Sequence, residues 1–539
     1  MVTRYNHEES EDKILKFWVE NKIYQKSKER GKDKPKFYFL QGPPYTSGKL
    51  HIGHAWNNSS KDVVLRYKRM RGYDVWDRAG YDMHGLPTAN KVQKQLGLKD
   101  KDAIIEYGMD KFVEECKAFS IKYAKLMDED LFRLGIWMDY ENAYYPIRNE
   151  FIEGEWYFIK KANEKNRLYK GKKVMTWCGD CETALAKHEL EYEEVTDKSI
   201  FLKFKIESTE DEFLVIWTTT PWTIPYNLAV MVNPVLDYVK IKVKDEVWIV
   251  AKDLAESVVK NLNLNKKEEE KIELDIIEEF KGKELEGVKY THPFKDKIDF
   301  ETDSEKLHTV LLSEEHVDTS AGSGLVHCAP GCGPEDYEVG MANGLKPFNK
   351  LNEKGEFVDM GEFSGMKAKL DDKKFIELLD MADALVTAVP VKHDYAHCWR
   401  CHKPVIFKTT EQWFLKVEDL TKEILDNNKD VNWFPEESNN SYERWVDNLK
   451  DNTITRQRFW GCPVPIWECE CGHHDVIGSK EELEEKSLSG VPKDFHRPYI
   501  DEVKIKCSVC DKDMSRIPDV LDVWIDSGTL SWTCLSTTS

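Results

Sequence analysis

The sequence lacks long apolar runs: its most apolar stretches, such as residues 213–217, are only a few residues long. A helix that crosses a bilayer needs about 20 apolar residues. The residues after Met1 also lack the charged and apolar segments of a secretion signal. We therefore expect a soluble, cytoplasmic protein with no membrane partner.

An excess of positive charge is also missing. The chain has 78 Lys and Arg against 98 Asp and Glu, a net charge of −20, which argues against a protein that coats nucleic acid through bulk charge. A local basic cluster on one predicted helix stays open as either a phosphate-binding patch or a solvated helix face: Lys61, Arg66, Lys68, Arg69 and Arg71. The charged residues from Lys266 to Glu279 are expected to cover a solvated edge.

The chain is nevertheless rich enough in apolar residues, at 41%, to bury sizeable cores. Its 539 residues suggest three to four folding units at roughly 150 residues each. A helix around residues 14–19 precedes a predicted basic linker, 26–36. A strand at 37–40, a glycine loop, a helix at 51–71 and a strand at 73–76 then form the βαβ opening of a nucleotide-binding α/β sheet.

Between residues 199 and 391 the pattern changes to short runs of Val, Ile, Thr and Trp separated by Gly and Pro turns. This pattern predicts a mostly β inserted domain. Mixed α/β patterning returns after Cys401. The predicted fold class is therefore an α/β core interrupted by a β-rich insertion.

Eight of the 13 cysteines form four close pairs: Cys178 and Cys181, Cys398 and Cys401, Cys469 and Cys471, and Cys507 and Cys510. Two such pairs can close a four-sulfur structural zinc site, so we pair the first with the second and the third with the fourth. Redox C-x-x-C motifs are the alternative. At the tighter third pair, His473 or His474 can replace one sulfur. The remaining five cysteines are expected to be buried thiols.

The sharpest motif runs from Gly42 to His54. His51 and His54 stand three residues apart at a helix start, so both imidazoles lie on one face near the positive end of the helix dipole. Gly53 lets a ring approach the backbone. The geometry suits a phosphate whose charge grows in a transition state; two surface histidines in a turn are the alternative.

His51-Ile52-Gly53-His54 resembles the HIGH motif of class I aminoacyl-tRNA synthetases, and Gly80 to Pro87 resembles the amino-acid-binding strand end of their isoleucyl branch. The resemblance implies a Rossmann-type HIGH core, with Asp82 pairing with the substrate ammonium group; a helix N-cap is the alternative role. The blocks 455–463 and 522–528 resemble further parts of that core. By the same resemblance Pro43 and Trp524 line the side-chain pocket, although Trp524 can also be an ordinary core residue.

Two segments of the insertion, 217–227 and 322–336, resemble the editing site of the isoleucyl, valyl and leucyl enzymes. Hydroxyl groups there can hold a water and a ribose, and an aspartate can capture a free α-amino group. The positions that match are Thr218, Thr219, Thr220, Thr223, His327 and Asp336. Threonine-rich strands with a glycine turn are the alternative.

The resemblance implies the following activity: ATP with Mg²⁺ activates isoleucine to the adenylate, transfer to tRNA(Ile) follows, and mischarged valyl-tRNA is hydrolysed. A monomer with two structural Zn²⁺ sites is expected. The family's KMSKS loop is missing, so we expect the amino-terminal portion of such an enzyme, with weak synthesis and surviving deacylation. The alternatives are the valyl branch, a free-standing editing deacylase and a zinc-ribbon nucleic-acid-binding protein.

The expected domain order is a first catalytic segment, a zinc-ribbon strand pair, the editing insertion, a return to the catalytic fold, a second zinc knuckle and an incomplete catalytic segment. Their respective bounds are 1–173, 174–198 with 392–408, 199–391, 409–464, 465–515 and 516–539.

Overall fold

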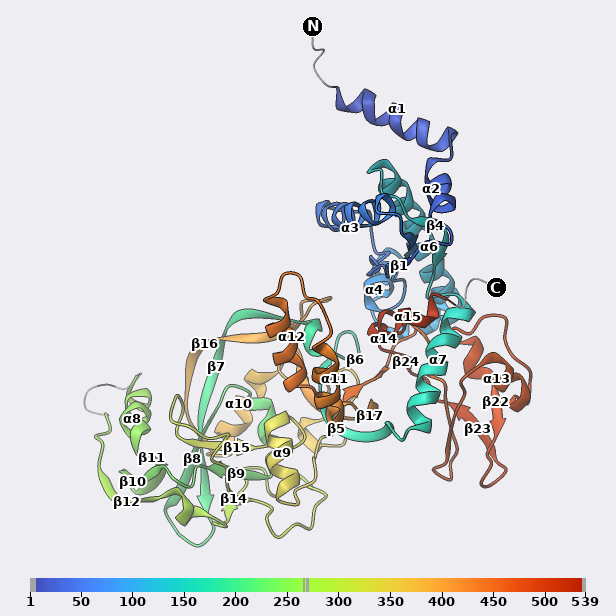
Figure 1. Ribbon diagram of the computed structural model, residues 1–539. Coiled ribbons are helices and arrows are strands. Elements are labelled where there is room, and N and C mark those ends of the chain that lie inside the picture. Colours follow the sequence, from blue (N-terminus) through green and yellow to red (C-terminus); the bar gives the residue numbers. More distant parts are fainter. Residues whose placement is uncertain (1–5, 265–266, 268–270, 536–539) are drawn as a thin grey trace. The chain divides into compact units, whose positions relative to one another are not determined.

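A computed structural model describes residues 6–264, 267 and 271–535. The chain forms two compact units, Met1–Gly171 with Gln412–Ser539, and Lys172–Glu411. Every hydrophobic core cluster of the described residues lies inside one of these units. The two units are therefore described separately, the discontinuous core unit first and the insertion unit second (Figure 1).

The core unit opens with the predicted βαβ motif. Strands β1 (Lys36–Tyr38) and β2 (Asp74–Trp76) pair in parallel, with Phe37 opposite Val75, and α3 (Ile52–Met70) connects them. The parallel pairing requires a crossover, which α3 supplies. An isolated parallel bridge pairs Tyr45, in the loop between β1 and α3, with Asp82, a few residues beyond β2. The loop that carries the first histidine motif therefore lies beside the strand end that carries Asp82.

The predicted basic linker is wrong, because most of it is helical. α1 (His7–Glu20) is followed by α2 (Ile23–Gly31), and Lys22 between them has a left-handed backbone with φ 50°. The charged residues of α2 obscured its one anchoring face, whose Tyr24 is largely buried and bonded to Asp77. Tertiary contact, rather than an apolar stripe, stabilises this helix.

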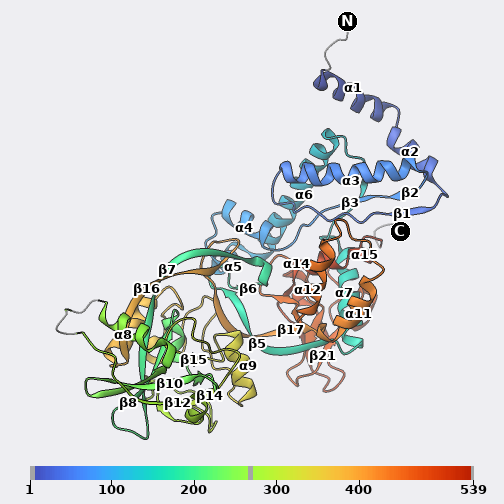
Figure 2. The same cartoon turned by 60° about the vertical axis from the view of Figure 1, so that its left-hand side comes forward.

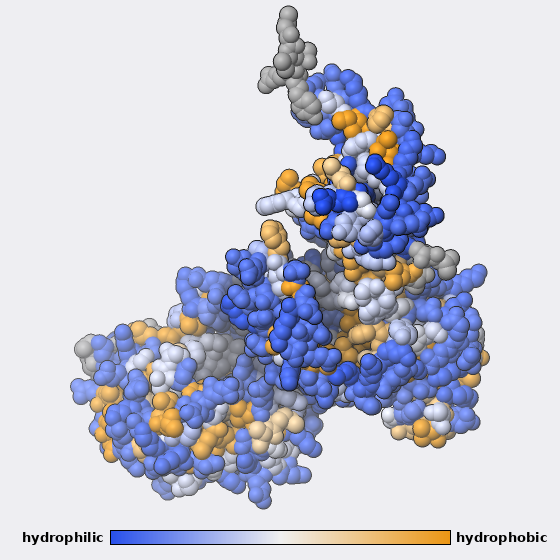
Figure 3. All heavy atoms as spheres, viewed as in Figure 1, coloured by the Kyte–Doolittle hydropathy of each residue, from blue (hydrophilic) through white to orange (hydrophobic). Residues whose placement is uncertain are grey.

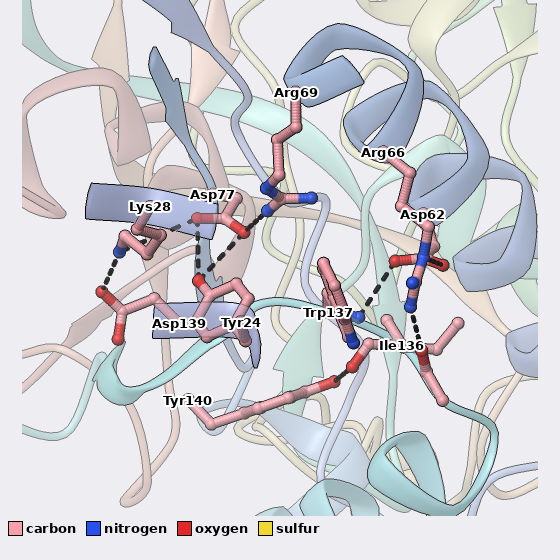
Figure 4. Close-up of polar contacts among 11 residues, drawn as sticks. Tyr24, Lys28, Asp62, Arg66, Arg69, Asp77, Ile136, Trp137, Asp139 and Tyr140 are labelled. Atoms are coloured by element: carbon pink, nitrogen blue, oxygen red, sulfur yellow. Dashed lines mark hydrogen bonds and ion pairs between the residues drawn. The ribbon is translucent and has the colours of Figure 1, made fainter. Parts of the chain in front are cut away.

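An ionic cluster holds α2 against the core unit (Figure 4). The Tyr24 hydroxyl lies 3.0 Å from both carboxylate oxygens of Asp77, and Arg69 pairs with the same carboxylate. Lys28 lies 3.0 Å from Asp139, which starts β4 (Asp139–Tyr144). The preceding helix, α1, has no buried residue, and Figure 3 shows hydrophobic residues gathered where α1 and α2 meet.

Helices α4 (Leu86–Gln95), α5 (Lys101–Tyr107) and α6 (Met109–Arg133) follow β3 (Arg78–Gly80). β3 pairs in parallel with β4. Gly80 permits this pairing, because a Cβ there would lie 1.9 Å from the Tyr144 ring. α7 (Asn149–Glu164) then leads to β5 (Leu168–Cys178), in which the chain passes from one unit to the other.

The second part of the core unit begins within β17 (Ile406–Leu415). Its further elements are α11 (Thr421–Asn428), α12 (Ser438–Asp447), β18 (Asn452–Thr453), β19 (Thr455–Arg456), β24 (Val520–Leu521), α14 (Val523–Gly528) and α15 (Leu530–Thr533). Between β19 and β24 in the chain lies a four-stranded sheet in the order β21-β20-β23-β22. Its elements are β20 (Ile466–Glu468), β21 (His474–Val476), α13 (Lys480–Lys486), β22 (Lys504–Lys506) and β23 (Asp513–Arg516). This sheet carries the third and fourth cysteine pairs.

The insertion unit is mostly β, as predicted. Its larger sheet has the order β12-β10-β11-β8-β7-β13, with β16 paired to β7 (Figure 2). These strands are β7 (Leu190–Ile206), β8 (Glu212–Thr218), β10 (Asp237–Val243), β11 (Glu246–Ala251), β12 (Ile276–Lys281), β13 (Tyr290–Thr291) and β16 (Leu385–Cys398). The long β7 and β16 arms end near the first two cysteine pairs, with Leu190 opposite Cys398.

A smaller sheet in the insertion has the order β14-β9-β15, from Thr309–Leu312, Ala229–Val232 and Leu325–Cys328. Helices α8 (Ala255–Asn263), α9 (Pro334–Ala342) and α10 (Asp372–Met381) complete this unit. Of the charged run predicted to cover an edge, residues 265–266 and 268–270 lie outside the described residues. Its last part enters β12, which is an exposed edge strand. None of the described helices combines the length and apolar character needed to cross a membrane.

Candidate functional site

The histidine motif caps a helix. His51 is the N-cap of α3, and its Nδ1 accepts a hydrogen bond of 3.1 Å from the backbone N–H of Gly53. The backbone N–H of His51 in turn donates to Nδ1 of His54 at 3.3 Å. The two rings lie 3.9 Å apart between centroids. A Cβ on Gly53 would lie 3.0 Å from the His51 ring, so the glycine permits this close approach.

These bonds determine the tautomer of both rings. A nitrogen that accepts a backbone N–H carries no proton, so each neutral imidazole carries its proton on Nε2. Burial, together with the positive charge of neighbouring groups, lowers the pKa of His54, which keeps that ring neutral near pH 7. The site therefore presents two Nε2–H donors beside the positive end of α3, an arrangement that suits a phosphate oxygen.

Asp82 lies beside this loop. Its backbone N–H donates to Pro44 O and its carbonyl accepts the N–H of Thr46, both at 2.9 Å. The Asp82 side chain is 7% exposed, and its Oδ1 has no hydrogen-bond partner among the described residues. Burial raises its pKa well above the ordinary value, and the charge of Asp526 adds to this. A buried carboxyl oxygen that lacks a hydrogen-bond partner among the described residues is suited to bind a cation.

The structure also brings together three sequence blocks that lie far apart in the chain. β19 pairs with β24, and Arg456 forms an ion pair with Asp522, the N-cap of α14. The indole N–H of Trp460 donates to Met83 O at 2.8 Å. The blocks 80–87, 455–463 and 522–528 thus form one site.

The predicted side-chain pocket residues are accessible at this site. Pro43 is half-buried in the loop before α3, and Trp524 is 49% exposed on α14, so Trp524 is not an ordinary core tryptophan. Their contact with an amino-acid side chain stays a prediction.

Four further buried residues belong to the site, and two of them, Glu155 and His496, lie outside the blocks that the sequence singled out. His84 Nδ1 lies 2.7 Å from Asp526 Oδ2, and His84 Nε2 lies 3.0 Å from Nε2 of His496. Glu155 on α7 is fully buried, and both of its carboxyl oxygens lack a hydrogen-bond partner among the described residues. Asp526 belongs to a recognised block, whereas no pattern in the sequence points to Glu155 or His496.

In the insertion unit four of the predicted editing residues form one hydrogen-bonded cluster, namely Thr218, Thr220, Thr223 and His327. Thr223 Oγ1 donates to Thr220 O at 2.8 Å and lies 3.0 Å from His327 Nε2. Thr218 Oγ1 accepts the backbone N–H of Thr220 at 3.1 Å. Because the Thr223 proton points to Thr220 O, His327 donates from Nε2, and its buried Nδ1, which has no partner among the described residues, is an acceptor. Thr219 is half-buried in the same turn.

Asp336 lies in the first turn of α9 and its Oδ2 accepts the backbone N–H of Ala329 at 2.9 Å. Burial raises its pKa to about 6, so the group is mostly ionised at neutral pH. Burial also lowers the pKa of His327 to about 4, which leaves that ring neutral. The insertion therefore offers a neutral histidine base, ordered hydroxyls and a carboxylate.

The eight paired cysteines form two clusters, as predicted. Cys178, Cys181, Cys398 and Cys401 form one cluster and Cys469, Cys471, Cys507 and Cys510 the other, and within each all sulfur atoms lie within 4.8 Å of one another. One pair of sulfur atoms in each cluster lies 3.4 Å apart, comparable with the roughly 3.8 Å edge of a ZnS₄ tetrahedron with bonds of about 2.3 Å. Both donor sets fit zinc.

The histidine alternative at the second cluster does not hold, because His473 bonds to Ser508 at 3.1 Å and His474 packs edge-on against Trp413. The five unpaired cysteines, Cys116, Cys328, Cys332, Cys462 and Cys534, are all buried, as expected.

Two of the five basic residues in the cluster on α3 are paired with acids of the same unit. Arg69 is 6% exposed and pairs with Asp77, while Arg66 pairs with Asp62 at 2.6 Å and stacks over Trp137 at 4.0 Å. Their role is to join α3 to the segment before β4 (Figure 4). A cavity of about 400 Å³ lies beside these residues, lined by α1, α2 and residues 132–142, and none of the predicted site residues lines it.

The fold and site define a class. The family model for tRNA synthetases class I (I, L, M and V) matches residues 13–538, so the chain belongs to this family. The chain is 45% identical over 542 aligned residues to the isoleucine–tRNA ligase of Methanocaldococcus jannaschii and 44% identical to that of Pyrococcus abyssi. Each alignment covers 98% of this chain and 52% of the relative, so the chain spans about half the length of these curated relatives.

Among solved structures, the LeuRS of a ternary complex with tRNA and LeuAMS from Agrobacterium radiobacter K84 is 17% identical, with a TM-score of 0.43 over 99% of this chain and 60% of that one. The family assignment rests on the family model and on the converging motifs.

Proposed function

We propose that this chain carries the amino-acid activation and editing sites of an isoleucyl-tRNA synthetase. The reaction joins isoleucine to ATP as the adenylate, releases pyrophosphate and transfers the isoleucyl group to tRNA(Ile), in the cytoplasm and as a monomer. The single observation that carries this proposal is the pair of Nε2–H donors of His51 and His54 placed beside the strand end of Asp82.

In this proposal His51 and His54 donate to the α-phosphate oxygens as the isoleucine carboxylate attacks phosphorus. Negative charge grows on those oxygens, and neutral donors fixed in advance stabilise it without reorganisation. Mg²⁺ bound with ATP supplies further charge neutralisation. Asp82 holds the substrate ammonium group, and Pro43 and Trp524 contact the branched side chain.

An editing site is needed because such a pocket discriminates only weakly between isoleucine and valine. One missing methylene changes the binding free energy by only about 1–3 kcal/mol. The discrimination of isoleucine from valine in this class of enzyme is the standard example of that limit. A second site must then hydrolyse the valyl ester. We propose that Asp336 binds the valyl ammonium group, while Thr218, Thr219, Thr220, Thr223 and His327 orient the ribose and the attacking water.

The two cysteine clusters are proposed to be structural Zn²⁺ sites. Four thiolates complete the tetrahedral shell and leave no open position for substrate. The alternative of a zinc-ribbon nucleic-acid-binding protein leaves the histidine and threonine clusters unexplained. A free-standing deacylase leaves the buried Asp82 site unexplained.

The proposal is tested in two assays on this chain. Hydrolysis of valyl-tRNA(Ile) should exceed that of isoleucyl-tRNA(Ile), and Asp336→Ala should abolish it, while the matched control Asp82→Ala should leave it unchanged. Isoleucine should bind with higher affinity than valine in calorimetry, and here Asp82→Ala should abolish binding while Asp336→Ala has no effect. Preference for valine in the binding assay would favour the valyl branch.

A further inference from the structure

The turn that carries Thr223 is poorly held by its own backbone. It is a short 3₁₀-helix, η2 (Pro221–Tyr226). Pro221 and Pro225 have no N–H to donate, and Pro225 also disfavours the helical backbone of Ile224 before it. The hydrogen bonds of a 3₁₀-helix have poorer geometry than those of an α-helix. The place of Thr223 therefore depends on contacts from outside the turn.

His292 supplies such a contact from another part of the insertion unit. It follows β13, which pairs with β7 of the larger sheet, and it is 1% exposed. Its Nε2 lies 3.0 Å from Ile224 O, and its Nδ1 accepts the backbone N–H of Phe294 at 3.0 Å. The ring thus joins the end of a sheet strand to the residue directly after Thr223.

The two partners of the His292 ring determine where its proton lies. A carbonyl oxygen can only accept, so Nε2 carries a proton and donates it to Ile224 O, while Nδ1, which accepts a backbone N–H, carries none. The neutral form agrees with the surroundings, since burial lowers the pKa of His292 to about 3. Both ring nitrogens are engaged within the protein, and neither is left to bind substrate.

Aromatic packing fixes the orientation of the same ring. Phe300 meets it edge-on, with ring centroids 4.9 Å apart, and the His308 ring stacks on it at 5.1 Å. A ring that is packed against two others and bonded at both nitrogens is held in one orientation. The direction of its Nε2–H bond toward Ile224 O is thus set before any substrate binds.

This hydrogen bond lies one residue away from the proposed editing chemistry. Thr223 Oγ1 donates to Thr220 O at 2.8 Å and lies 3.0 Å from His327 Nε2. Ile224 O also accepts the backbone N–H of Asn227 at 2.9 Å, which closes the far end of η2. A bond that holds this carbonyl therefore holds the end of the turn and the hydroxyl that faces His327.

We propose that His292 is a positioning residue of the editing reaction, which keeps the Thr223 hydroxyl in place by donating a hydrogen bond to Ile224 O. This proposal rests on the proposed editing function of the insertion. Asp336, which is proposed to bind the valyl ammonium group, lies on α9 and is held by the backbone of Ala329 instead. Loss of the His292 donor should therefore lower kcat and leave KM nearly unchanged.

Two substitutions of His292 separate its two hydrogen bonds. The amide nitrogen of glutamine reaches the place of Nε2, so His292→Gln keeps the donor to Ile224 O and loses the acceptor for Phe294. An asparagine side chain reaches only the place of Nδ1, so His292→Asn keeps that acceptor and loses the donor. Since each variant loses one hydrogen bond, a purely structural role predicts similar losses of melting temperature and of activity in both.

Hydrolysis of valyl-tRNA(Ile) by the unsubstituted chain and by both variants tests the proposal. His292→Gln should keep kcat within about threefold, whereas His292→Asn should lower it about tenfold, the effect of one hydrogen bond, with little change of KM in either. The control His393→Asn, which replaces a partly exposed histidine of β16 in the same unit, should retain the original rate. Equal kcat values for the two His292 variants would overturn the proposal.

Nitrogen-15 NMR of the histidine rings tests the same contact without any tRNA. The Nε2 proton signal of His327 should be unchanged in His292→Gln, while in His292→Asn it should shift as it does in the reference Thr223→Val, which cannot accept this hydrogen bond. An unchanged signal in His292→Asn contradicts the proposal. If the signal responds as expected but the unsubstituted chain hydrolyses no valyl ester, the editing function fails, whereas the placement of Thr223 by His292 stands.

Discussion

At the scale of single residues, both predicted sites are built from carboxyls kept in dry surroundings. Asp82 and Asp526 in the core unit, and Asp336 in the insertion, all have a raised pKa because burial disfavours their charged form. Such groups destabilise the folded protein until a cation arrives. Under the proposed function, this shared property would let one chain bind an ammonium group at two separate places.

Asp336 gives a test of this idea through stability. Its pKa is raised to about 6, so it binds a proton more tightly in the folded chain than in the unfolded chain. The stability it contributes is full below about pH 4 and is lost as the pH rises through 6. Asp336→Asn should therefore stabilise the chain by about 2–3 kcal/mol above pH 7, and by almost nothing below pH 4. Urea unfolding at both pH values measures this.

The same substitution should abolish deacylation of valyl-tRNA(Ile), because a neutral amide cannot neutralise an ammonium group. A gain in stability together with a loss of hydrolysis would show that the carboxylate serves binding. Unchanged hydrolysis would contradict this role.

Gly53 offers a test at the other site. A Cβ there would lie 3.0 Å from Cε1 and 3.1 Å from Nδ1 of His51, so Gly53→Ala should turn the His51 ring away. Alanine favours the helix by up to about 1 kcal/mol, so the fold should not weaken. We expect ATP binding, measured by calorimetry, to fall at least tenfold, the effect of losing about 1.4 kcal/mol. The control Gly48→Ala, whose Cβ meets only the end of Lys91 at 3.5 Å, should have little effect.

At the scale of elements, contacts between distant segments hold the functional helices. α2 depends on Asp77, which sits at the end of β2 and receives bonds from Tyr24 and Arg69. The Asp77 side chain is fully buried and that of Arg69 is 6% exposed. The cluster is expected to stabilise the chain only while it is complete, since removing one partner leaves the other charge uncompensated.

Asp77→Ala should therefore lower the free energy of unfolding by about 3–5 kcal/mol. Tryptophan fluorescence should also change, because Trp137 lies beside the Tyr24 and Arg69 side chains. The control Asp12→Ala removes an exposed carboxylate of α1 and should stay within about 0.5 kcal/mol of the original. Equal effects of the two substitutions would show that the cluster does not anchor α2.

A cysteine substitution in the second cluster tests whether bound zinc stabilises the four-stranded sheet that carries this cluster. Elemental analysis should find two zinc ions per chain, and Cys510→Ser should leave one. Because a structural zinc contributes its binding energy to folding, the same substitution should lower the melting temperature by several degrees. Ser508→Ala, in the same turn, should keep both ions. Retention of two ions by Cys510→Ser would contradict the four-sulfur site.

At the scale of the whole molecule, the two units have separate cores. Residues 172–411 contain the clusters around Trp222 and Val250, whereas the clusters around Trp156 and Phe112 belong to the other unit. A polypeptide of residues 172–411 should therefore fold alone and bind one zinc ion. It should also hydrolyse valyl-tRNA(Ile), measured by release of labelled valine. Circular dichroism of an unfolded polypeptide would contradict this independence.

Much of this organisation was predictable. The glycine-proline loop after residues 37–40 predicted the βαβ motif, and the threonine and glycine pattern predicted the β-rich insertion, because local backbone preferences and turn residues act over short distances. The cysteine spacing predicted both clusters. The linker was predicted wrongly because α2 has many charged residues, and its anchor, Asp77, is far from it in the sequence.

The sequence by itself determined which groups are available: the two histidines on one helix face, the paired cysteines and the carboxyl of Asp82. Only the tertiary structure decided which charges and hydrogen-bond partners surround each of them. It paired Arg66 and Arg69 with acids of the same unit, and it joined His84 to Asp526 and His496 across more than 400 residues. Burial and charge pairing depend on neighbours brought together by folding, and no local pattern records them.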